Sequence, residues 1–326
     1  MKRVSIVIPV YNVERYLAKC LDSLLMQTNK DFKVIIVNDG SPDNCQDIID
    51  DYVKEYPDFI QGYIKENGGL SDARNYGMQY VDTEFVLFID SDDFVEPDLV
   101  EKVLGEVDET VDMVVFDYNQ YYEKDDKKLV IHNGLKEGKN YSLSEHPDIM
   151  ITIKNAAWNK LYRTSLFIEN KIQYPKGYRY EDLGTTFKLL LHTRNIRFLN
   201  IPLVNYLVDR SGNITTTYDK KIYDILAMVK ENNDYYIQKN SFQTYYEELK
   251  YITVRNVLEC LKKTPYMSDS VFVMKFIDDS YTCIKEYFPD YRKTKYQLKQ
   301  ERFDNIYLNP FLCKLYYRYK WLWRRK

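Results

Sequence analysis

The chain has 326 residues, of which 45% are hydrophobic and 29% are charged, as is typical of a globular protein with a substantial core and not of a disordered chain. Its net charge of −3 conceals a segregation, because residues 291–326 hold eleven Lys or Arg and two acidic residues, a local +9 that leaves −12 for residues 1–290. An acidic body repels phosphate backbones and argues against a nucleic-acid partner, whereas the basic tail favours an anionic surface.

The first part of the chain alternates short apolar runs with longer helical patterns. Strands are predicted at 4–10, 32–37, 59–64, 85–90 and 113–116, and helices at 13–27, 43–55, 70–80 and 97–107. Such alternation is the signature of βαβ units and a parallel sheet. Residues 1–117 are therefore predicted to form a nucleotide-binding α/β half.

The remainder is less regular and then becomes helical. Residues 118–138 are charged and rich in Tyr, which predicts an exposed hairpin or loop. Further on we expect helices at 144–154 and 180–192, an extended run at 196–207, and helices at 222–238, 245–262 and 271–288. No apolar stretch reaches the ~20 residues of a membrane span, and the apolar run at the N-terminus is too short for a signal peptide.

The five cysteines are odd in number, scattered and without a C-x-x-C pair, so neither a disulfide framework nor a zinc site is expected. A cytoplasmic location follows from this pattern.

An acidic cluster follows the apolar run at 85–89, where Asp90, Ser91, Asp92 and Asp93 stand in sequence. In open α/β sheets the ligand crevice lies outside the carboxyl ends of such strands. Clustered carboxylates raise one another's pKa, and their hard oxygens suit Mg²⁺ or Mn²⁺, which would hold a diphosphate. The alternative is structural, since Asp92 or Asp93 would also serve as the cap of a helix starting near Pro97.

Other polar residues follow the first two predicted strands. Tyr11 comes directly after strand one, where a tyrosine ring can stack on a planar base, and Asn12 and Glu14 are equally typical of helix caps. No G-x-G-x-x-G follows this strand, which removes the dinucleotide fingerprint. Asp39 follows strand two and is placed to accept a hydrogen bond from a base or a ribose.

Three later motifs complete the set. A glycine turn at 67–69 precedes a helix that presents Arg74 in its first turns, a combination that attracts phosphate. Glu181 and Asp182 open a further helix, where they either complement its dipole or supply a general base that deprotonates a sugar hydroxyl. The third motif reads W-N-K-L at 158–161.

In chain order these motifs resemble those of inverting family 2 glycosyltransferases with the GT-A fold. They read V-S-I-V-I-P-V-Y-N, V-N-D-G-S, N-G-G-L-S-x-A-R-N, F-I-D-S-D-D, W-N-K-L-Y-R and Y-E-D, and the resemblance covers residues 1–210. It implies a Rossmann-like, mostly parallel sheet flanked by helices. The expected domains are 1–117 for the nucleotide sugar, 118–217 for acceptor and catalytic base, and 218–326 as a C-terminal helical extension.

The resemblance also implies roles for the residues that bind the donor. The first acidic motif of the family binds the uridine of a UDP-sugar, which implies Asp39, with Pro9, Tyr11 and Glu14 nearby. The Asp-x-Asp motif contacts ribose and a Mn²⁺ or Mg²⁺ ion, which implies Asp90, Ser91 and Asp92, with the two aspartates as metal ligands.

On the acceptor side the resemblance implies Asp182 as the base, with Glu181 as the second candidate. Trp158, Asn159 and Lys160 match a motif that lines the acceptor and the donor sugar. On the nucleotide side, Arg74 is similar to the family's arginine near the nucleotide.

The chain lacks the Q-x-x-R-W motif of processive members, which implies transfer of one sugar at a time. The resemblance itself implies a glycan or lipid-linked acceptor and the synthesis of a surface polysaccharide such as capsule or teichoic acid. A sugar nucleotidyltransferase would carry a glycine-rich basic loop after strand one, where this chain has P-V-Y-N-V-E. A catalytically inactive binding module would be favoured by broken acidic motifs, and these are intact.

The last predicted helix, at 311–325, has an aromatic and aliphatic arc made of Phe311, Leu312, Leu315, Tyr316, Tyr319, Leu322 and Trp323. Basic residues on its other side favour a helix lying in an anionic membrane interface over residues 310–326, which would make the protein peripheral on the inner face of the membrane. The alternative is that the arc packs on the catalytic domain. The helical region before it is expected to recognise the acceptor or to form a homodimer.

Overall fold

The computed structural model describes residues 2–210, 219–296 and 304–323, which form two compact units. The first unit consists of Met1–His146, Thr152–Gly177 and Thr185–Asn213. The second consists of Pro147–Ile151, Tyr178–Gly184 and Ile214–Lys326. The expected boundary at 117/118 falls inside one continuous strand, so both halves of the expected catalytic domain share a single sheet.

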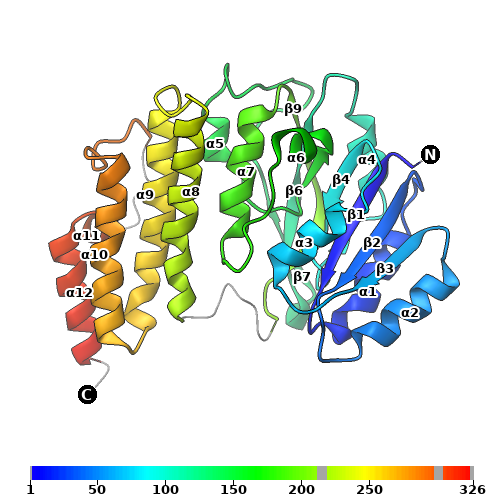
Figure 1. Cartoon of the computed structure of the whole chain (residues 1–326), viewed down its shortest axis with the longest axis horizontal. Coiled ribbons are helices and arrows are strands. Elements are labelled where there is room, and N and C mark those ends of the chain that lie inside the picture. Colours follow the sequence, from blue (N-terminus) through cyan, green and yellow to red (C-terminus); the bar gives the residue numbers. More distant parts are fainter. Residues whose placement is uncertain (1, 211–218, 297–303, 324–326) are drawn as a thin grey trace. The chain divides into compact units, whose positions relative to one another are not determined.

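The described part of the first unit contains a mixed nine-stranded sheet (Figure 1). Its strands are β1 (Val4–Val10), β2 (Phe32–Asn38), β3 (Ile60–Ile64), β4 (Phe85–Phe88), β5 (Phe94–Val95), β6 (Met113–Tyr122), β7 (Lys127–Ile131), β8 (Lys160–Arg163) and β9 (Ile196–Leu207). They lie in the order β3-β2-β1-β4-β8-β6-β9-β5, and β7 pairs with β6.

The strands β3, β2, β1 and β4 are mutually parallel, as the alternating pattern predicts. Val10 lies opposite Asn38, and Val7 lies opposite Phe88, so the three strands β1, β2 and β4 end at one edge of the sheet. Beyond β4 the sheet becomes mixed, because β8 runs antiparallel to both β4 and β6. Strand β8 is absent from the prediction, since a run of four residues is too short to show a period.

Helices cover both faces of this sheet. They are α1 (Glu14–Leu25), α2 (Cys45–Glu55), α3 (Leu70–Met78), α4 (Leu99–Gly105), α6 (Ser165–Asn170) and most of α7 (Glu181–His192). Leu17, Leu21 and Leu24 recur at the spacing of one helix face and join the core formed by alternate residues of β1. Helix α3 packs closely against β1, because the side chain of Val7 fills the space where a Cβ of Gly77 would lie.

Two predicted segments differ in detail. The segment 118–138 does form a hairpin, in which β7 is exposed, but β6 extends to Tyr122 and pairs with β9 on its other side. The helix predicted at 144–154 is reduced to one turn, α5 (Ile149–Thr152). Pro147 has no N–H to donate and interrupts the pattern before that turn.

The described part of the second unit is mainly helical. It contains α8 (Asp224–Gln238), α9 (Tyr246–Lys263), α10 (Ser270–Tyr287), α11 (Asp304–Tyr307) and α12 (Pro310–Trp323). Figure 1 shows α8, α9 and α10 side by side, with α12 next to α10. Asp269 caps α10 by accepting a hydrogen bond from the backbone N–H of Phe272. These helices confirm the three predicted at 222–288. Among the helices of the described residues, none combines the length and the apolar composition of a membrane-spanning segment.

Candidate active site

The acidic cluster lies in a tight turn that begins where β4 leaves the sheet. The N–H of Ile89 donates to the carbonyl of Val7 at 3.1 Å, and the N–H of Asp93 then donates to the carbonyl of Asp90 at 3.0 Å. This turn places Asp90 and Asp92 at the edge of the sheet where β1 and β2 also end. The fold therefore places the predicted carboxylates at the sheet edge outside which open α/β sheets bind their ligands.

Each of these two carboxylates has an arginine as its partner. Arg74 donates to Asp90 at 2.8 Å, and Arg210 pairs with Asp92 while also donating to the carbonyl of Asn12 at 3.3 Å. Burial, together with the charge of Asp90, raises the pKa of Asp92 above its usual value. Arg210 was missed in the sequence, because it follows β9 and belongs to no motif.

Asp93 has a structural role in the same turn. Its side chain is 1% exposed, and its Oδ1 accepts the N–H of Leu207 at 2.9 Å. Burial and the neighbouring aspartates raise its pKa well above the usual value. The capping alternative for this cluster is wrong, since α4 begins at Leu99 and its cap position is Asp98.

The donor set of Asp90 and Asp92 fits a hard divalent ion. Two repelling carboxylates are the kind of pair that a cation relieves, and Mg²⁺ commonly takes one or two protein carboxylates and completes its shell with water and substrate phosphate. No group of three or more His, Cys, Asp or Glu side chains arranged to hold a metal occurs in the described ranges. The protein would therefore supply only part of the shell.

The end of β1 offers an exposed ring, and the residues after it are linked to the start of α2. Tyr11 is 49% exposed, as stacking on a base requires, and Pro9 is buried within the strand. Asn12 adopts a left-handed backbone (φ 55°) and donates its N–H to Ser41 at 2.7 Å. Glu14 accepts two hydrogen bonds of 2.9 Å from Asn44, so its carboxylate joins the starts of α1 and α2.

Asp39 lies beneath the glycine turn and is 2% exposed. It accepts hydrogen bonds from Lys65 at 2.6 Å and from the N–H groups of Gly68 and Gly69 at 3.0 and 2.7 Å. A carboxylate oxygen can accept two hydrogen bonds, and Oδ2 makes one of these three, which leaves capacity for a base or ribose.

Lys65 extends this contact into a network of alternating charges. It also pairs with Asp72 at 2.6 Å, and Asp72 in turn pairs with Lys176. Burial alone would raise the pKa of Asp72, but the hydrogen bonds and charges of the two lysines hold it below its usual value. Neither lysine was singled out in the sequence, since neither belongs to a motif.

The helix after the glycine turn presents Arg74 as predicted, although the side chain is 1% exposed. Its guanidinium lies over the ring of Tyr174 at 5.1 Å. The neighbouring Asn75 exchanges two hydrogen bonds with the backbone of Tyr174, at 2.8 and 2.9 Å. This pair anchors the segment that carries Lys176.

The motif at 158–160 faces inward. Trp158 stacks on Tyr206 with ring centroids 5.2 Å apart, and Asn159 donates to the carbonyl of Phe116 at 3.2 Å. Lys160 is fully buried, and its ammonium donates to the carbonyls of Lys154 and Ala156 and to Asn159, at 2.5–2.6 Å. These polar groups are therefore suited to shaping the loop at 154–156, and the contact of the three residues with a sugar stays a prediction.

The predicted base lies in the second unit, within Tyr178–Gly184. Glu181 and Asp182 are half-buried in the first turn of α7. Tyr180, directly before them, has φ +63°, which is a strained conformation for a bulky residue. Arg179 holds this backbone in place by a bidentate pair with Asp219 at 2.7–2.8 Å and by an N–H bond to Asp224 at 2.9 Å. Strain of this kind is typical of functional positions.

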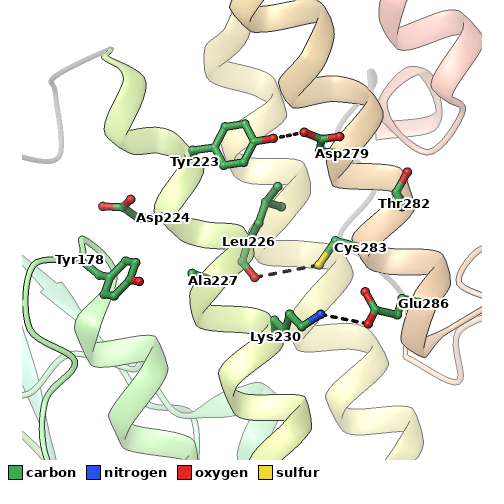
Figure 2. A pocket seen from close by; sticks show the side chains of 10 residues that line it. All are labelled: Tyr178, Tyr223, Asp224, Leu226, Ala227, Lys230, Asp279, Thr282, Cys283 and Glu286. Atoms are coloured by element: carbon green, nitrogen blue, oxygen red, sulfur yellow. Dashed lines mark hydrogen bonds and ion pairs between the residues drawn. The ribbon is translucent and has the colours of Figure 1, made fainter.

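A hollow of about 400 Å³ adjoins this segment within the second unit (Figure 2). Tyr178 lines it together with Tyr223, which directly precedes α8, and with residues of α8 and α10, among them Asp224, Asp279 and Glu286. Figure 2 shows Lys230 paired with Glu286, at 3.0 Å, and Tyr223 bonded to Asp279. Tyrosine rings and carboxylates are groups that can contact the faces and hydroxyls of a sugar.

Comparison with known proteins matches the sequence of this chain to a protein family. The family model described as glycosyl transferase family 2 matches residues 5–170. The putative glycosyltransferase EpsH of Bacillus subtilis is 31% identical over 265 residues, which cover 79% of this chain and 76% of EpsH.

Solved structures share the fold at low identity. Residues 1–349 of S. aureus TarS, in complex with UDP-GlcNAc, superpose with a TM-score of 0.61 at 18% identity over 90% of this chain and 93% of that one. The mannosyltransferase PcManGT of Pyrobaculum calidifontis, in complex with GDP-Man and Mn²⁺, gives a TM-score of 0.53 at 13% identity over 100% of this chain and 89% of that one. Both likenesses confirm the expected GT-A fold.

Proposed function

Because this chain belongs to glycosyltransferase family 2, we propose that it is a non-processive, inverting enzyme that moves one sugar from a UDP-sugar to a hydroxyl of a glycan or lipid-linked acceptor. The observation that carries the proposal is the pair Asp90 and Asp92 at the edge where three parallel strands end. The UDP-GlcNAc of TarS and the GDP-Man of PcManGT support a nucleotide-sugar donor. The setting that we propose is surface-polysaccharide synthesis on the cytoplasmic side of the membrane.

The donor is proposed to bind along the carboxyl edge of the sheet. The exposed ring of Tyr11 stacks on the uracil, and Oδ2 of Asp39 accepts a hydrogen bond from the base or ribose. Arg74 and Arg210 lie beside the aspartates and supply positive charge to the diphosphate.

A divalent ion would be held by Asp90 and Asp92. Mn²⁺ bound in PcManGT supports this assignment. When bound, such an ion supplies Lewis-acid stabilisation of the charge on the leaving diphosphate.

The reaction is proposed to be a single displacement. Asp182 takes the proton of the acceptor hydroxyl, whose oxygen forms a bond to the anomeric carbon from the side opposite the diphosphate. The bond between that carbon and the diphosphate oxygen breaks, and its electron pair leaves with UDP. Inversion follows, so an α-linked donor gives a β-linkage.

The acceptor is proposed to lie in the hollow beside Tyr178. Two features support this: the hollow shares a chain segment with Asp182, and its lining offers rings and carboxylates to a saccharide. Tyr178→Ala is expected to lower transfer to acceptors in a membrane extract and to leave slow donor hydrolysis without acceptor unchanged. Equal loss of transfer and of donor hydrolysis would contradict the assignment of the hollow as the acceptor site.

The proposed function is tested by incubating the purified protein with Mn²⁺ and a panel of UDP-sugars, and by measuring UDP release without acceptor. Release from one donor, absent in Asp92→Ala, is the expected result. Calorimetry with UDP serves as the second measurement. No release together with no UDP binding would overturn the proposal, and UDP binding without turnover on any donor or acceptor extract would favour an inactive binding module.

A further inference from the structure

We propose that the outer face of α12 is a docking surface for a bilayer that contains anionic lipids. Among the side chains of this helix that the structure describes, five large apolar ones are exposed: Phe311 (73%), Leu312 (40%), Leu315 (55%), Tyr319 (63%) and Leu322 (59%). At 100° per residue they occupy one contiguous arc. An exposed apolar patch of this kind marks an interaction site.

The opposite face of α12 already packs within its own unit. Cys313 and Tyr317 are 1% and 2% exposed, and Lys314 pairs with Asp278 of α10. The helix is therefore held in place without its apolar arc. The five exposed residues therefore do not follow the alternative that the arc packs on the protein, whereas Tyr316 of the same arc is half-buried with its ring against that of Tyr307.

The charged side chains that the C-terminal segment itself contributes are of one sign. From residue 305 to residue 326 the sequence has six Lys or Arg and no acidic residue. Arg318 is exposed beside Phe311 on the helical arc. Apolar and aromatic side chains together with Lys and Arg are the composition of helices that lie in an anionic lipid interface.

A second cationic feature lies at the start of the helix. Lys285, Arg292 and Lys293 contribute to the lining of a shallow hollow of about 440 Å³, and Asp290 is its one acidic residue. Arg292 donates to the carbonyl of Leu308 at 3.3 Å, which ties the hollow to the residues just before α12. Asp290 is itself engaged by Lys250 at 2.8 Å, so the hollow offers net positive charge to a lipid phosphate.

A second copy of the chain fits this face less well. A symmetric dimer formed through α12 would bring the same patch of each copy together. Because α12 itself contributes only cations to this face, the two copies would repel each other there. The charge complementarity therefore favours an anionic bilayer.

The test is sedimentation of the full chain with phosphatidylcholine vesicles, with and without phosphatidylglycerol. Binding is expected with phosphatidylglycerol and should weaken as salt rises. Phe311→Ser/Leu315→Ser/Tyr319→Ser should lower the partition coefficient about tenfold or more. The matched control is Met26→Ser/Ile168→Ser/Val271→Ser, which removes exposed apolar side chains elsewhere and should leave the partition coefficient unchanged.

A charge series separates the two parts of the surface. Lys285→Ala/Lys293→Ala/Arg318→Ala should weaken binding only to vesicles that contain phosphatidylglycerol, and Lys102→Ala/Lys127→Ala/Lys139→Ala is its control. Circular dichroism verifies that each variant is folded. Equal binding by the parent and the α12 variant, or no binding by the parent, would overturn the proposal. A dimer in light scattering that the α12 variant converts to a monomer, without vesicle binding, would instead identify a self-interface. None of these outcomes depends on the donor chemistry.

Discussion

Glu181 and Asp182 stand next to each other, yet only one of them is proposed to take a proton. Both are half-buried in the first turn of α7, behind the strained backbone of Tyr180. Because neighbouring residues on a helix point in different directions, the two carboxylates cannot serve the same hydroxyl equally. The proposed base is Asp182.

Asp182→Asn is expected to lower kcat by about 10²-fold or more, because an amide cannot accept the proton of the acceptor hydroxyl. UDP affinity should stay nearly unchanged, since the nucleotide contacts are proposed to come from other residues. Initial rates and calorimetry with UDP give the two readouts. Glu181→Gln is the matched control, and an equal loss in the control, or a parallel loss of UDP binding in Asp182→Asn, would contradict the assignment.

Arg210 and a metal ion compete for Asp92 in the proposed site. The guanidinium of Arg210 pairs with the carboxylate of Asp92, which is 20% exposed. A metal ion must therefore displace Arg210 or share the carboxylate with it. Arg210→Ala is therefore expected to tighten Mn²⁺ binding without donor by about fivefold, or ~1 kcal/mol. Calorimetry or Mn²⁺ electron paramagnetic resonance measures this affinity. Asp92→Asn should weaken binding, and weaker Mn²⁺ binding in Arg210→Ala would show that the arginine does not compete.

At the scale of elements, Asp112 joins three segments of the first unit. It precedes β6 and is 2% exposed. It accepts hydrogen bonds of 2.8–3.0 Å from Arg194, which precedes β9, and pairs with Arg163 of β8 at 3.4 Å. Burial alone would raise its pKa, but the hydrogen bonds and charges of these arginines hold it below its usual value.

A carboxylate with a lowered pKa stabilises the folded state above its unfolded pKa, near 4, and this stabilisation is lost as the pH falls through the folded pKa. Asp112→Asn should therefore cost about 2 kcal/mol of unfolding free energy at pH 7. The difference from the parent should narrow below about pH 4. Urea unfolding at several pH values measures this difference in unfolding free energy, and the substitution Asp58→Asn at an exposed position is the control. A difference that is independent of pH would rule out the ion pairs as its cause.

Elements with a clear period or cap were predictable, and those made by pairing were not. The parallel strands and the long helices follow from apolar periodicity. Strand β8 was missed because its four residues acquire a strand conformation only by pairing with β4 and β6. The same pairing explains why the W-N-K motif faces inward, with Lys160 fully buried.

At the scale of the whole molecule, all five cysteines are buried as free thiols, at 0–9% exposure. Burial raises the pKa of Cys45, Cys260, Cys283 and Cys313 to about 11, and that of Cys20 well above its usual value. The thiolate is the reactive form, so a raised pKa and a buried sulfur both slow the reaction.

Ellman's reagent at pH 8 is therefore expected to modify almost none of the thiols in the native protein within minutes, and all five in guanidinium chloride. A bound UDP-sugar should not change the number of thiols that the reagent modifies in the native protein. Fast reaction of one thiol in the native protein would show that its unit opens locally.

The sequence by itself determined the parallel strands, the long helices and the motifs that identify the family, because periodicity and local turn chemistry depend on neighbouring residues. The tertiary structure decided which charges meet. The pairs Arg210 with Asp92 and Lys65 with Asp39 join residues 118 and 26 positions apart, and no local pattern specifies such partners. The tertiary structure also decided which face of α12 is buried. The helical pattern defines the two faces, but packing against neighbouring helices, among them α10 and α11, buries Cys313 and leaves Phe311 in solvent.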